Sequence, residues 1–130
     1  MAAYEKAHID DIASNRWPHW IPVRHYFGIE TFGINIWRRQ DDGTVIPEHD
    51  ESASGAPELY YVVEGQATFT VAGDEVDAPA GTCVWITDPS AKRAGRATAA
   101  NTLVLTVGAA AAGQAYAPAG WDSHYLDGDK

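Results

Sequence analysis

Residues 43–65, GTVIPEHDESASGAPELYYVVEG, contain two predicted strands joined by a link of small residues. Side chains alternate between the two faces of a strand, so His49 and Glu51 are expected to point the same way. The second strand begins at Glu58, and Tyr60 shares its face. Polar side chains at the ends of these two strands can therefore meet in one pocket.

The whole chain has the length and composition of a single globular domain. Of its 130 residues 45% are hydrophobic, and its 12 glycines and 7 prolines are spread along the sequence. Such spacing of turn-forming residues is typical of many short strands rather than of long helices.

Charge and hydropathy restrict the partners. The net charge of −9 argues against nucleic acid and against an anionic membrane surface. No apolar run approaches the roughly eighteen residues that cross a membrane. Cys83 is the only cysteine, which excludes an internal disulfide. We therefore expect a soluble, cytoplasmic protein.

The N-terminal part reads as an arm outside the main domain. Residues 4–16 have the pattern of a short helix, and an extended segment with Trp17 and Trp20 follows. This segment is too short to fold alone, so its aromatic rings must pack on the chain's own domain or on a neighbouring subunit. Because aromatic residues are enriched in interfaces, we expect a homodimer held partly by this arm.

The rest of the chain is a series of short apolar or alternating segments separated by turn residues. Seven or eight such strands predict an all-β antiparallel sandwich or barrel. Besides the two strands of the opening stretch, the predicted strands are residues 23–39, 66–72, 76–79, 82–87, 92–98 and 101–107.

The opening stretch resembles the first motif of the cupin superfamily, which is glycine, five residues, His-x-His, a short gap, glutamate, six residues and glycine. Gly43 to His49 fits this spacing, and so does Glu58 to Gly65. The chain departs from the motif in two ways. Glu51 replaces the second histidine, and the gap between Glu51 and the motif glutamate, Glu58, is six residues rather than three or four.

The resemblance implies a single cupin barrel, that is, a double-stranded β-helix or jelly roll. It covers residues 23–108, with residues 1–22 as the N-terminal arm and residues 109–130 as a C-terminal tail.

The family's second motif, glycine, five residues, Pro-x-Gly, two residues, histidine, is degenerate here. Counting from Gly81 places residues 87–89 in the turn and Lys92 at the histidine position. Counting from Gly73 places Val84 there instead. We prefer the first count, and in both counts the metal-binding histidine is absent.

The resemblance also implies a metal site of three histidines and one glutamate. This chain offers His49, Glu51 and Glu58, which could hold divalent iron, manganese or zinc. Lys92 at the fourth position would repel such an ion and pair with the carboxylates instead. We therefore expect no bound metal, with these three residues as the ligands in the alternative case.

Two functions are compatible with these residues. The first is a binding protein that holds a small polar or anionic ligand in the barrel, with Tyr60, Glu51 and Arg93 as ligand-binding residues. We prefer it, because the residues that define the family's metal chemistry are those that have changed.

The alternative is a cupin enzyme of the metal-dependent oxygenase or of the isomerase or lyase type, acting through His49, Glu51 and Glu58. In that case His49 is the expected general base, Glu58 orients it, and Lys92 stabilises a developing anion.

Overall fold

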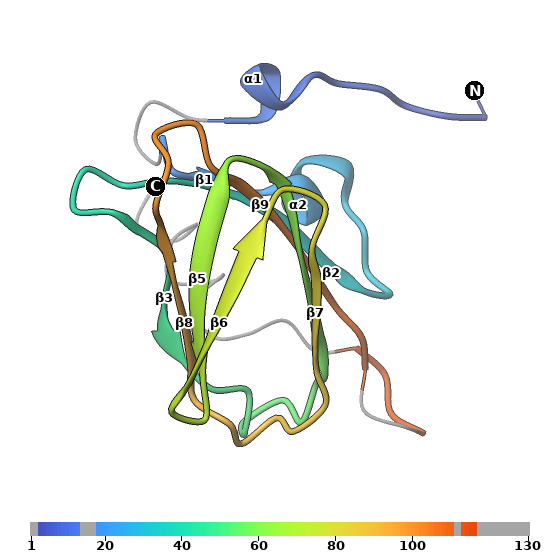
Figure 1. The fold of residues 1–130 in the computed structure, drawn as a ribbon. Coiled ribbons are helices and arrows are strands. Elements are labelled where there is room, and N and C mark those ends of the chain that lie inside the picture. Colours follow the sequence, from blue (N-terminus) through green and yellow to red (C-terminus); the bar gives the residue numbers. More distant parts are fainter. Residues whose placement is uncertain (1–2, 14–17, 111–112, 117–130) are drawn as a thin grey trace.

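The computed structural model describes residues 3–13, 18–110 and 113–116, and their strands form two antiparallel sheets that face each other (Figure 1). This arrangement confirms the predicted all-β barrel. The first sheet has the order β1 (Trp20–Ile21), β2 (Gly33–Arg38), β9 (Leu103–Gly108), β4 (Glu58–Glu64), β7 (Cys83–Ile86). The second has the order β3 (Thr44–His49), β8 (Arg93–Ala97), β5 (Gln66–Val71), β6 (Asp74–Pro79).

The core lies between the two sheets and follows from side-chain alternation along the strands. Strand β2 alternates between buried and half-buried residues over its whole length. On β4 the side chains of Tyr60 and Val62 point inward, and on β5 those of Ala67 and Phe69 do. Burial of these apolar faces between the sheets is the main stabilising contribution to such a fold.

Gly65 forms the tight turn between β4 and β5. Its φ of +75° lies in the left-handed region, which favours glycine. The backbone of Thr102 packs directly against it: a Cβ built on Gly65 would lie 2.6 Å from Thr102 Cα. The turn therefore requires glycine both for its dihedral angle and for its lack of a side chain.

The predicted strand over residues 23–39 is wrong in its first half. Val23–Phe27 forms helix α2, which ends at Gly28 in the left-handed conformation, and β2 begins only at Gly33. The Gly28 N–H closes the helix by donating to the carbonyls of Arg24 and His25. Apolar content alone does not separate a short helix from a strand.

The predicted helix over residues 4–16 is reduced, among the described residues, to α1 (Ile9–Ile12). Trp20 is fully buried: it pairs with Trp37 across β1 and β2 and donates from its indole N–H to Asn35 Oδ1 at 2.9 Å. This tryptophan of the predicted arm thus packs on the chain's own barrel, whereas Trp17 lies outside the described residues. Within the described part of the chain, no helix has the length and apolarity needed to span a membrane.

Candidate functional site

The candidate site lies between the two sheets, at the end where β3 finishes and β4 begins. His49 is the last residue of β3, and Glu58 is the first residue of β4. The intervening loop brings Glu51 back to the same place, because its backbone N–H donates to the carbonyl of Pro89 at 2.8 Å. The loop residue is thereby anchored to the connection between β7 and β8.

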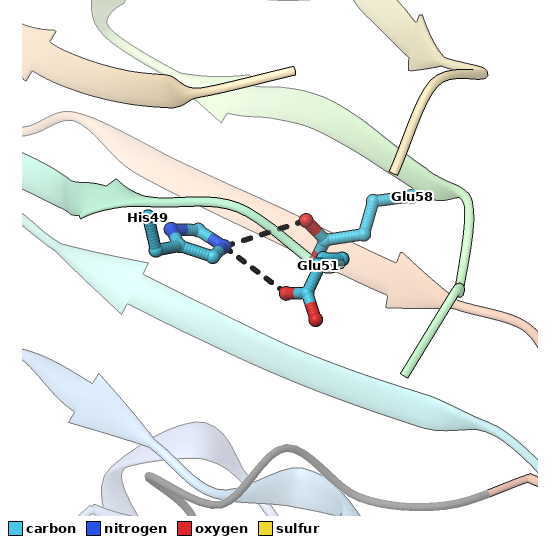
Figure 2. A group of neighbouring side chains, drawn as sticks. All are labelled: His49, Glu51 and Glu58. Carbon is cyan, nitrogen blue, oxygen red and sulfur yellow. Dashed lines mark ion pairs between the residues drawn. The ribbon is translucent and has the colours of Figure 1, made fainter. Parts of the chain in front are cut away.

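The three side chains point toward one another (Figure 2). His49 Nε2 lies 3.1 Å from Glu51 Oε1 and 3.5 Å from Glu58 Oε1. One donor atom from each of the three residues lies within 4.8 Å of the other two, so the cluster is of a kind that can hold a metal ion. The structure therefore brings together the three residues that the sequence singled out.

A fourth charged group, the guanidinium of Arg93, completes the cluster. Arg93 lies on β8 opposite His49, and its side chain is fully buried. Nη1 donates to Glu58 Oε1 at 2.7 Å, Nε to the Ala91 carbonyl at 2.8 Å and Nη2 to the Asp88 carbonyl at 3.0 Å. The arginine thus ties the loop before β8 to the first residue of β4.

Lys92 does not point into the site. Its side chain is exposed, whereas that of Arg93 is buried. Adjacent side chains on a strand face opposite ways, so only one of the two can point inward. The inward cation is therefore Arg93, one position beyond the residue that the motif count places at the histidine position. The sequence signal that could have identified Arg93 as the inward cation is the pair of small residues Gly95 and Ala97, which lie on the same strand face as Arg93.

Both ring nitrogens of His49 face oxygen acceptors. Nδ1 lies 2.9 Å from the Pro47 carbonyl, which can only accept, and Nε2 faces the carboxylates of Glu51 and Glu58. Burial disfavours the imidazolium, but these acceptors outweigh burial and raise the pKa of His49 to about 10. The ring is accordingly a double donor at neutral pH.

The carboxyl of Glu58 accepts more than one hydrogen bond at the same oxygen. Besides Arg93, the hydroxyl of Tyr60 donates to Glu58 Oε1 at 3.0 Å. Burial opposes ionisation of Glu58, but contacts with His49 and Arg93 lower the pKa of this carboxyl below its ordinary value. Burial and the negative charge of Glu58 raise the pKa of Tyr60 well above its ordinary value. Tyr60 is thus a neutral donor that helps to keep Glu58 ionised.

A cavity of about 230 Å³ opens beside this cluster. Its wall combines the polar cluster with aromatic and aliphatic side chains from both sheets. The lining residues are Asn35, Trp37, Ile46, Pro47, Glu48, His49, Glu51, Glu58, Tyr60 and Thr106. Arg93 lies behind Glu58 and is not part of the lining.

The lining residues of the other strands, chiefly Asn35 and Trp37 on β2 and Thr106 on β9, are not among those expected from the sequence. Their inward, period-two placement marks them as facing the core, but nothing local relates them to His49. Only the pairing of β2 with β9 and of β9 with β4 brings them to the cavity.

Comparison with solved structures identifies the fold. A cupin protein (BF4112) from Bacteroides fragilis matches with a TM-score of 0.67 at 18% identity, over 91% of this chain and 93% of that chain. KdgF from Halomonas sp. matches with a TM-score of 0.52 at 15% identity, over 65% of this chain and 73% of that chain. An RmlC-like cupin protein from Desulfovibrio desulfuricans matches with a TM-score of 0.50 at 23% identity, over 62% and 73%.

No family model matches the sequence, and no curated protein matches it either. The three structural matches nevertheless show that the chain has the fold of the cupin superfamily, which confirms the resemblance seen in its first motif. At these identities the likeness concerns the fold, and the function has to be argued from the site.

Proposed function

We propose that this chain is a binding protein that holds a small polar molecule in the cavity between its two sheets. The observation that carries the proposal is the cavity of about 230 Å³, whose wall places the His49, Glu51 and Glu58 side chains beside Trp37 and Ile46. A concave, mostly apolar pocket with a few convergent polar groups is the usual form of a small-molecule site.

The charges of the cluster support a binding role without a metal. Two carboxylates, Glu51 and Glu58, are matched by two cations, imidazolium His49 and guanidinium Arg93. Each buried charge therefore has a partner of opposite sign, as buried ions require. In this proposal Glu51 and Tyr60 face the ligand, while Arg93 holds Glu58 in place from behind instead of contacting the ligand.

Blocking the cavity tests this proposal. In ligand-observed NMR with a set of small polar fragments, some fragments should bind the native chain and fail to bind the variant Pro47→Trp. Pro47 is an exposed residue of the cavity lining, so a tryptophan there narrows the opening of the cavity. The matched control is Thr70→Trp, which adds the same ring at an exposed position on β5 outside the lining.

Fragments that bind both variants equally would place binding elsewhere on the surface. That result, or no fragment binding to the native chain, would contradict the proposed function.

The second candidate is a metal-dependent enzyme, which the convergence of three donor atoms within 4.8 Å favours. A metal ligand needs a lone pair on His49 Nε2, so a divalent ion would have to displace the proton that this nitrogen directs at the two carboxylates. Glu58 Oε1 already accepts from Arg93 and Tyr60. A catalytic version of this site would use protonated His49 as a general acid, rather than as the expected general base.

We expect the purified chain to contain well below one equivalent of iron, manganese or zinc. Elemental analysis of protein prepared without a metal-affinity step measures this directly. One equivalent that is lost in His49→Ala but retained in His8→Ala, an exposed histidine outside the cluster, would favour the enzyme instead.

A homodimer remains part of the proposal, but Trp20 gives it no support. That side chain is fully buried within the chain's own sheet and has no surface to offer a second subunit.

A further inference from the structure

We infer that the ligand of this cavity is a small organic cation, of the ammonium type, and not an anion. The inference rests on the proposed function and narrows it to one class of ligand. It differs from the polar or anionic ligand expected from the sequence, because that expectation counted Arg93 among the ligand-binding residues, whereas Arg93 does not line the cavity.

The charges on the cavity wall favour a cation. Three carboxylates line it, those of Glu48, Glu51 and Glu58, and His49 is the cationic group among the lining residues. With Arg93 paired to Glu58 from outside the lining, one negative charge, that of Glu48, remains unmatched. Arg93 is absent from the lining, and its guanidinium is committed to Glu58 and to two backbone carbonyls. The net charge of −9 adds a long-range field of the same sign.

The donors on the wall are committed to protein acceptors, so an anion would find few partners. Tyr60 donates to Glu58 at 3.0 Å. The indole N–H of Trp37 donates to Thr106 Oγ1 at 3.3 Å, and the Thr106 hydroxyl donates to the Asn35 carbonyl at 3.4 Å. Among the described residues of the lining, the side-chain amide of Asn35 is the neutral donor that makes no such bond.

Acceptors, in contrast, are available. Within the described part of the chain, no hydrogen bond or ion pair reaches Glu58 Oε2 or the exposed carboxylate of Glu48. An ammonium group supplies up to three donors and no acceptor, which matches this inventory. The Trp37 indole on the same wall can add a cation–π contribution.

Three probes with the same ring and different charge test the inference: cyclohexylamine, cyclohexanol and cyclohexanecarboxylate, titrated into the full chain at pH 7 by calorimetry. We expect the amine to bind at least tenfold more tightly than the carboxylate, and more tightly than the alcohol. Glu48→Gln should weaken amine binding by up to about fivefold, as expected for one partly exposed ion pair. Glu75→Gln removes the same charge from an exposed position on β6 outside the lining and should leave binding unchanged.

Equal binding of the three probes, tighter binding of the carboxylate, or no binding of the amine at millimolar concentration would overturn the inference. So would an equal loss in Glu48→Gln and Glu75→Gln, because it would attribute the preference to the overall charge of the chain. None of these results touches the proposed function, which the fragment experiment with Pro47→Trp decides separately.

Discussion

Replacing Arg93 by methionine should lower the free energy of unfolding by about 3 kcal/mol or more, the range seen when one partner of a buried ion pair is removed. Methionine retains much of the apolar stem but none of the donors. The change leaves the Glu58 carboxylate without its closest cation, at 2.7 Å, and removes the donors to the Asp88 and Ala91 carbonyls. Urea denaturation at neutral pH measures the loss.

Lys92→Met is the matched control, since it removes the adjacent cation, directly before β8. The Lys92 side chain is exposed, so this change should alter stability by no more than about 0.5 kcal/mol. Arg93→Lys should recover only part of the loss, because an ammonium group cannot span the carboxylate and both carbonyls. Equal effects of the two methionine variants would mean that Arg93 does not hold the site together.

Gly65→Ala should destabilise the chain by about 3 kcal/mol or more, the sum of a strained dihedral angle and a steric overlap. The added Cβ would lie 2.6 Å from Thr102 Cα and 2.9 Å from Thr102 N. Both are backbone atoms, so no side-chain rotation can relieve the contact. Thermal or urea denaturation of the purified variant gives the magnitude.

Gly73→Ala separates the two causes. Gly73 also has a positive φ, +87°, but a Cβ there would meet no heavy atom within 4 Å. This variant should therefore lose only the cost of the left-handed conformation, about 1–2 kcal/mol. Similar losses in both variants would show that the approach of Thr102 to Gly65 contributes little.

Local patterns were sufficient for the fold class and for part of the site. Side-chain alternation along two strands that are consecutive in the sequence predicted that His49 and Glu58 face one pocket. The distances of 3.1 Å from His49 to Glu51 and 3.5 Å from His49 to Glu58 show that the three side chains are close together. These features depend on side-chain period and on turn residues such as Gly65, which act within a few positions of the chain.

The tertiary structure decided which cation enters the site and what lines the cavity. The register of β8 against β3 places Arg93 opposite His49 and turns Lys92 to solvent. A shift of one residue would exchange them, and no local pattern forbids that shift. Likewise, the pairing of β2 with β9, some seventy positions apart in the sequence, brings Trp37 and Thr106 to the cavity. Such long-range pairing depends on the packing of two whole sheets and not on local sequence.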